Sequence, residues 1–205
     1  KPVVGKDGLE RVIVSINFSL APKAIQTRVK KVQGFVYDFS SAYDISPPLV
    51  FAIIHTESYF NPMAQSAANA YGLMQLVPTS GGADSYRSVY NSDGYPTQEF
   101  LFIPKNNVEL GCAYVDLLLN RYLNDISNVL TRQYLAIAAY NTGVSNVYKA
   151  YDPNGSKSRA ITQIESMTPQ DNYEYLIQNL PYEETRDYLK KVVDRSILYE
   201  SWSEN

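Results

Sequence analysis

The stretch PPLVFAIIHTESYFNPMAQSAANAYGLMQ, residues 47–75, places an ionisable carboxylate directly after an apolar run. On a helix, Val50, Ile53 and Ile54 lie seven, four and three positions before Glu57, so the four side chains share one stripe. This stripe is apolar until it reaches Glu57. The pattern therefore predicts a buried helix whose last turn points an acid in the direction of the core.

An acid in an apolar setting has a specific chemical use. Loss of hydration disfavours the charged form of Glu57 and raises its pKa, and a carboxyl that stays protonated near neutral pH can act as a general acid. The alternative is a glutamate at a helix end that reaches solvent or pairs with an arginine, as most helical glutamates do. Position alone favours this alternative, so the choice between the two interpretations depends on the residues around Glu57.

Composition narrows the class of protein. The chain has 205 residues, 45% of them hydrophobic and 19% charged, which is enough for one compact core. A formal charge of −3 gives no general attraction to nucleic acid or to an anionic membrane. The single cysteine, Cys112, rules out a disulfide within the chain and is expected to be a small buried hydrophobe. No run approaches the ~20 apolar residues that span a bilayer, and the abrupt start at Lys1 is typical of a trimmed chain.

The first residues have a different pattern from the rest. RVIVSINFSL, residues 11–20, alternates apolar and polar side chains and predicts a half-buried strand. A single strand needs a partner. We expect either a short hairpin with residues 2–5 or the last strand of a sheet from an upstream domain. The predicted division is a β segment at 1–21 and a helical domain at 22–205.

From Pro22 the period becomes helical. Ser46 and Pro47 fit the N-cap and first position of the helix that carries Glu57, and Gly143 fits the end of another. The predicted fold class is mainly α (α+β), with one N-terminal strand segment. Helices are expected around 25–43, 47–58, 108–122, 133–142 and after Pro181, with breaks at NPMAQSAANAYG, TSGGADS and NSDGYPTQ.

Three motifs follow one another in the chain. ES-F-NP-A-S at 57–66 is followed by GLMQ at 72–75, AYN-G stands at 139–143, and P-ETR-YL-KV at 181–192. Together they resemble the soluble-lytic-transglycosylase-type domain. LF-P-NN-ELG-AY at 101–114 is most similar to the membrane-bound lytic murein transglycosylase C group, whose members carry an upstream domain. The resemblance implies a helical domain like that of goose-type lysozyme.

The resemblance also implies a reaction. This family cleaves the β-1,4 bond between N-acetylmuramic acid and N-acetylglucosamine in peptidoglycan without adding water. Glu57 would protonate the glycosidic oxygen and then act as base on the muramoyl C6 hydroxyl, which closes a 1,6-anhydro ring. Ordinary glycosidases use two carboxylates. The next acid after Glu57 is Asp84, but sequence distance is not spatial distance, so Glu99, Glu109 and Glu165 remain candidates for a second carboxylate.

The same resemblance assigns supporting residues. It implies that Ser66 and Gln75 line the cleft, that Tyr140 and Asn141 lie under the acid with the Tyr140 hydroxyl steering it, and that Tyr199 approaches the same carboxyl. Met74 and Tyr188 are also included among the cleft residues. Met74 is expected to form part of the cleft wall. For Tyr188 a packing role is favoured over a catalytic one, because an aromatic side chain on a helix stripe usually belongs to the core.

Partners and location follow from the resemblance as well. They are peptidoglycan glycan strands, possible wall-synthesis or assembly complexes, and the periplasm, with a lipid anchor in the outer membrane outside this chain. No cofactor is implied, and His55, the only histidine, has no metal-ligand partner at zinc spacing. Two other functions remain open, a hydrolytic muramidase like goose-type lysozyme and a non-catalytic wall-binding module.

Overall fold

Helices dominate the structure, as the periodicity predicts. The structure is a computed structural model that describes residues 2–4, 10–12 and 23–203. Its elements in chain order are β1 Pro2–Val4, β2 Glu10–Val12, α1 Lys23–Ala42, α2 Pro47–Ser58, α3 Gly81–Tyr90, α4 Gln98–Leu101, α5 Pro104–Leu117, the π-helical turn η1 Leu118–Tyr122, α6 Val129–Thr142, α7 Val144–Tyr151, α8 Lys157–Glu165, α9 Pro169–Asn179 and α10 Glu183–Ser203.

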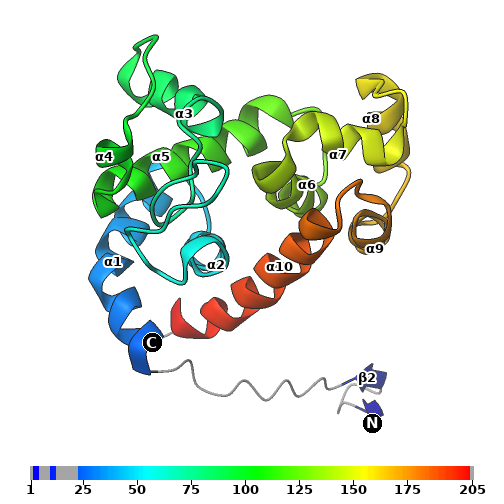
Figure 1. The fold of residues 1–205 in the computed structure, drawn as a ribbon. Helices are drawn as coiled ribbons and strands as arrows, with labels where there is room; N and C mark the ends of the chain where they lie inside the picture. The colour runs from blue at the N-terminus through cyan, green and yellow to red at the C-terminus, as the bar shows by residue number, and fades with distance from the viewer. Residues whose placement is uncertain (1, 5–9, 13–22, 204–205) are drawn as a thin grey trace.

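The helices form two groups joined by the last helix. Helices α1 to α5 lie on one side and α6 to α9 on the other, while α10 runs beneath both (Figure 1). Helix α10 packs along α2 and α6. This arrangement brings the end of α2, the end of α6 and the start of α10 close together, although they are far apart in the sequence.

Helix α2 forms the centre of the core. Its residues Val50, Ala52 and Ile54 are fully buried, because the run is apolar on every face. Pro47 stands at the first helical position and Ser46 at the N-cap, as predicted, but the Ser46 side chain makes no capping hydrogen bond. The helix ends at Ser58, so Glu57 lies in its last turn, as the sequence predicts.

The N-terminal strands pair with each other. β1 and β2 are antiparallel, with Pro2 opposite Val12, as in one of the two expected arrangements, the hairpin with residues 2–5. Residues 13–20 of the predicted strand lie outside the described residues. The interpretation of residues 1–21 as the remnant of an upstream domain stays a prediction.

Several element boundaries differ from the expectation. The predicted break TSGGADS contains the start of α3, because Gly81 and Gly82 provide close packing rather than a turn. A Cβ on Gly82 would lie 2.7 Å from the Val77 carbonyl oxygen, and one on Gly81 2.8 Å from the Tyr114 ring. The predicted helix at 108–122 begins earlier, at Pro104, and its last turn is π-helical.

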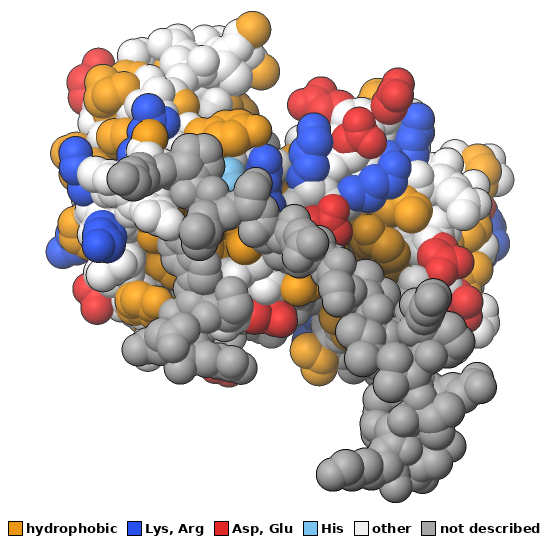
Figure 2. Space-filling model, turned by 90° about the horizontal axis from the view of Figure 1, so that it is seen from below, with side chains coloured by type: hydrophobic (Ala, Val, Ile, Leu, Met, Phe, Trp, Pro, Cys, Tyr) orange, Lys and Arg blue, Asp and Glu red, His pale blue; other side chains and the backbone are white. Residues whose placement is uncertain are grey.

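Acidic and basic side chains gather on part of the lower face. Figure 2 shows them beside one another, with hydrophobic side chains elsewhere on this face. On α10, Lys190 and Asp187 form an ion pair, with a distance of 3.6 Å. In the described part of the chain, no helix is both long and apolar enough to cross a bilayer.

Candidate active site

A cleft of about 360 Å³ opens beside the end of α2. Its walls come from both groups of helices and from the loop that joins α2 to α3. It is lined by Glu57, Ser66, Ala68, Ala70, Gln75, Leu76, Val77, Ser80, Gly81, Tyr114, Tyr140, Asn141, Thr142, Gly143 and Glu184. The three sequence motifs thus meet in one cavity, and Glu57 is part of its lining.

Glu57 is half-buried, and its surroundings favour the protonated carboxyl. Burial raises the pKa of its carboxyl, the nearby Tyr188 hydroxyl lowers it and the negative charge of Glu184 raises it, and together they bring the pKa to about 7. Burial is the largest of these effects, as the apolar stripe on α2 predicts. At neutral pH a large fraction of Glu57 therefore carries the proton that a general acid donates.

Two buried tyrosines lie next to this carboxyl. The Tyr188 hydroxyl adjoins Glu57, but the contact falls short of ordinary hydrogen-bond geometry, and no other described protein atom partners this hydroxyl. The Tyr140 hydroxyl donates to the Met74 carbonyl oxygen at 2.8 Å. Burial and the charge of Glu57 raise the pKa of both tyrosines well above 10, so both hydroxyls stay protonated.

The loop after Glu57 is held by a buried asparagine. Asn107 on α5 accepts a hydrogen bond from the Met74 amide at 2.7 Å and donates to the carbonyl oxygens of Tyr71 and Leu101, both at 2.8 Å. The Ser58 hydroxyl donates to the Leu73 carbonyl oxygen at 2.7 Å. These bonds fix the cleft wall to the helices behind it.

Ser66 and Gln75 line the cleft, where the resemblance places them. The Ser66 hydroxyl accepts hydrogen bonds from the amides of Ala68 and Ala70. The Gln75 amide nitrogen donates to the carbonyl oxygens of Ala64 and Gly72 at 3.0 and 2.9 Å. Both side chains therefore stabilise the loop, and the Gln75 carbonyl oxygen keeps acceptor capacity for a ligand.

This geometry agrees with the comparison against known protein families. The family model for the Transglycosylase SLT domain matches residues 14–163. The chain belongs to this family. Its relatives include membrane-bound lytic murein transglycosylase C of Klebsiella pneumoniae strain 342, 42% identical over 89% of the chain, and that of Cronobacter sakazakii, 39% identical over 92% of the chain. The chain spans about half the length of these relatives, 50% and 52%.

Solved structures show the same fold. An inactive mutant of lytic transglycosylase Slt from Pseudomonas aeruginosa superposes with a TM-score of 0.64 and 23% identity, over 84% of this chain and 24% of that protein. The 70 kDa soluble lytic transglycosylase of Escherichia coli gives a TM-score of 0.61 and 21% identity, over 88% of this chain and 26% of that protein. The SLT domain described here is therefore mainly α, as predicted.

In this SLT domain, Tyr199 was expected to approach Glu57, but another tyrosine lies beside this acid. The Tyr199 hydroxyl lies 3.0 Å from the His55 ring nitrogen Nδ1, and Tyr199 packs among buried rings of the core. The residue beside Glu57 is Tyr188. Eleven residues of helix separate the two tyrosines by about 16 Å along α10, so the two side chains meet different parts of α2. His55 is buried and packs against Tyr199.

Met74 also has a different place from the one expected. Its side chain is fully buried rather than part of the cleft wall, and it packs so closely on Gly111 that a Cβ at this glycine would collide with the Met74 sulfur. Met74 supports the site through its backbone instead, because its carbonyl oxygen fixes the Tyr140 hydroxyl. Tyr140 therefore borders the acid, but its hydroxyl bonds the loop and not Glu57.

Sequence reasoning missed the second carboxylate of the cleft, Glu184. Glu184 lines the cleft, while Arg186 donates to the Leu180 carbonyl oxygen. The neighbouring Thr185 hydroxyl donates to the Asn141 side chain at 2.6 Å, which ties the start of α10 to α6. The position of Glu184 in the ETR motif was the available signal.

The other candidates for a second carboxylate do not line this cleft. Glu109 accepts a hydrogen bond from the Tyr90 hydroxyl at 2.9 Å, and Glu165 accepts two from Ser127. Glu99 is exposed in the first turn of α4. Among the described residues, no group of three or more His, Cys, Asp or Glu side chains is arranged to hold a metal ion.

Proposed function

We propose that this chain is the catalytic domain of a peptidoglycan lytic transglycosylase, with Glu57 as its general acid and base. The observation that carries the proposal is a single carboxyl with a pKa of about 7 in a cleft lined by the family's motifs. Membership of the SLT family supports the reaction class.

The proposed reaction needs only the proton of Glu57. The acid donates it to the glycosidic oxygen as the bond from this oxygen to C1 of N-acetylmuramic acid breaks. The C6 hydroxyl of the same sugar then bonds to C1, and its proton returns to the Glu57 carboxylate. One bond is broken, one is formed and no water is consumed, so the product carries a 1,6-anhydro ring.

The surroundings of Glu57 suit both halves of this reaction. Burial favours the protonated acid before bond cleavage. After the proton has left, the Tyr188 hydroxyl can turn its hydrogen toward the carboxylate, because no other described protein atom partners it. This interaction orients the carboxylate for its role as base. Ser66, Gln75 and Asn141 are proposed to contact the sugars, with Ser66 near the acetamido group.

A hydrolytic muramidase is the second candidate, and Glu184 is the observation that favours it. A second carboxylate in the cleft could activate water, as in inverting glycosidases. In the transglycosylase that we propose, the charge of Glu184 instead helps to keep Glu57 protonated.

Product mass separates the two reactions. Purified peptidoglycan digested with the chain should release fragments with anhydro ends, one water lighter than hydrolysed fragments, when analysed by mass spectrometry. A hen-type lysozyme digest of the same material provides the hydrolysed reference. Fragments with only reducing ends would contradict the proposed reaction and support the muramidase. Binding without any fragment would support a non-catalytic wall-binding module.

The location is also a proposal. The relatives are named membrane-bound lytic murein transglycosylase C, which supports a cell-envelope enzyme. We propose that the full protein acts in the periplasm, attached to the outer membrane by a lipid anchor outside this chain. Its partner is the glycan strand of peptidoglycan, and association with wall-synthesis or assembly complexes stays a prediction.

A further inference from the structure

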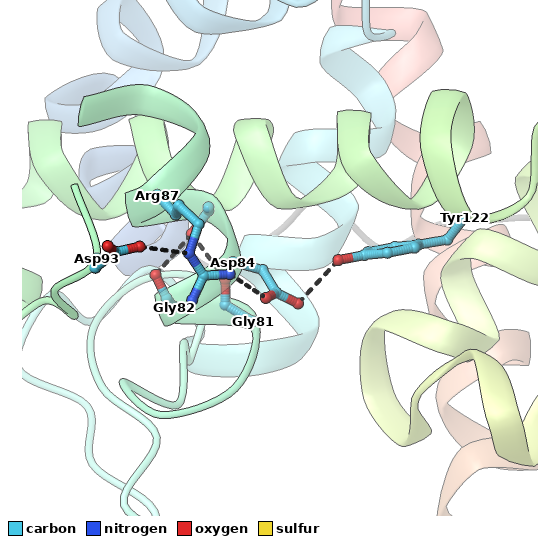
Figure 3. A network of polar contacts seen from close by, with 7 residues as sticks. Gly81, Gly82, Asp84, Arg87, Asp93 and Tyr122 are labelled. Carbon is cyan, nitrogen blue, oxygen red and sulfur yellow. Dashed lines mark hydrogen bonds and ion pairs between the residues drawn. The ribbon is translucent and has the colours of Figure 1, made fainter. Parts of the chain in front are cut away.

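A hydrogen bond connects two elements just beyond one end of the cleft. The Tyr122 hydroxyl of η1 donates to Asp84 Oδ2 of α3 at 3.1 Å. Figure 3 shows the Tyr122 side chain extending toward Asp84 across the space between the two elements. Both side chains are half-exposed, so the pair lies at the surface and not in the core.

Asp84 and Tyr122 each have a further contact that stabilises their position. Arg87 lies 3.7 Å from Asp84 Oδ1 and 3.8 Å from Asp93 Oδ1, which leaves Asp84 Oδ2 for Tyr122 (Figure 3). The Tyr148 hydroxyl donates to the Tyr122 carbonyl oxygen at 3.3 Å. The π-helical turn changes the direction in which Tyr122 projects relative to a regular continuation of α5, and such turns are frequent at functional sites.

Asp84 and Tyr122 each lie near residues that line the cleft. Ser80 and Gly81 line the cleft one helical turn before Asp84 on α3, and Tyr114 lines it about two turns before Tyr122. Tyr114 lies within electrostatic reach of both partners: burial, together with the charges of Asp84 and Tyr122, raises its pKa to about 12. The hydrogen bond therefore lies next to the part of the cleft that α3 and α5 line.

On the side of Glu184, the cleft continues into a further depression. A second depression shares Ala68, Asn141, Thr142 and Glu184 with the cleft and extends it along Pro181, Tyr182 and Arg186. The Tyr182 side chain is 55% exposed there and offers a ring on which a sugar can stack. The two ends of the groove thus differ. The end near Glu184 has an extension, and the end near Ser80 has the Asp84–Tyr122 hydrogen bond.

We propose that the Asp84–Tyr122 hydrogen bond is a bar that stops the glycan strand at this end of the cleft, so that the enzyme cleaves a fixed short distance from a strand end. The inference rests on the proposed function, because it concerns the same cleft and the same substrate. A strand that enters along Tyr182 passes Glu57 and ends against the bar. Internal cleavage requires the strand to leave the cleft at both ends.

The test measures the length of early products. Uncrosslinked glycan strands are digested to low conversion, and the anhydro-ended fragments are sized by chromatography with mass detection. The native chain should release short fragments of uniform length from the start. Tyr122→Ala removes the bar and should increase the mean length of early fragments several-fold, and Asp84→Ala, which removes the partner on α3, should act in the same direction.

A matched control is available on the same helix. The Tyr90 hydroxyl donates to Glu109 and also joins α3 to α5, but neither residue lines the cleft. Tyr90→Ala should leave the fragment lengths unchanged. Broad fragment lengths from the native chain, or native lengths from folded Tyr122→Ala and Asp84→Ala, would overturn the bar. Uniform short fragments with hydrolysed ends would support the bar while overturning the proposed reaction, and no cleavage at all would overturn both.

Discussion

Replacing Glu57 with glutamine is expected to lower the rate of glycan cleavage by roughly 10²–10⁴-fold or more, the contribution of general acid and base catalysis. The amide has nearly the same shape as the carboxyl but cannot donate a titrating proton. The measurement is the release of fragments from purified peptidoglycan, together with a pull-down of the variant on the same insoluble material. Binding should persist while cleavage is lost.

The same variant has an expected effect on stability. Because the pKa of Glu57 is raised to about 7, the folded chain binds its proton more tightly than the unfolded chain does. Stability is therefore lost as the pH rises from the ordinary carboxyl range through about 7, by at most about 3 kcal/mol at ~1.36 kcal/mol per pKa unit. Urea unfolding should show Glu57→Gln gaining stability relative to the native chain between pH 5 and pH 8.

Two results would contradict this account of Glu57. Cleavage retained by Glu57→Gln would point to another acid, and Glu184 is the carboxylate to test next because it lines the same cleft. An equal difference in unfolding free energy between variant and native chain at both pH values would mean that Glu57 titrates normally in the folded state.

The second large effect is expected from Asn107→Ala. The asparagine is fully buried and satisfies the Met74 amide and the carbonyl oxygens of Tyr71 and Leu101. Its loss leaves the Met74 amide and the Leu101 carbonyl oxygen without partners, each worth about 1–3 kcal/mol, while the Tyr71 carbonyl oxygen keeps its bond from the Leu76 amide, so we expect a loss of about 2–5 kcal/mol in the free energy of unfolding. Chemical denaturation monitored by circular dichroism measures this.

The neighbouring Asn106 provides the control. Its side chain makes one long hydrogen bond, 3.4 Å to the Phe100 carbonyl oxygen, and is partly exposed. Asn106→Ala should therefore cost less than about 1 kcal/mol, as a weak exposed hydrogen bond does. Similar losses for both variants would show that the Asn107 network does not hold the loop. Because Met74 also binds Tyr140, Asn107→Ala should lower activity as well as stability.

The sequence predicted the features that depend on local pattern. The apolar stripe on α2 is continuous in sequence, so both the buried helix and the raised pKa of Glu57 could be inferred from neighbouring residues. The mainly α fold followed from periodicity. The meeting of the motifs in one cleft was implied by the family resemblance and not by spacing.

Features that depend on packing between distant helices could not be predicted in this way. Tyr188 and Tyr199 share one face of α10, and only the way α10 lies on α2 decides which of them meets Glu57. The direction of Glu184 depends on the bond between Thr185 and Asn141. Met74 belongs to the GLMQ loop in the sequence, but Gly111 has no side chain, so the core has room for the Met74 side chain.

The most direct test of the account is a titration of the Glu57 carboxyl by NMR, with ¹³C-labelled glutamate and Glu57→Gln to assign the signal. We expect a pKa of about 7, with burial as the main cause, and a lower value in Glu184→Gln, because the neighbouring charge is then absent. A Glu57 pKa near the ordinary 4.5 in the native chain would contradict it, since the acid would be ionised when it has to donate its proton.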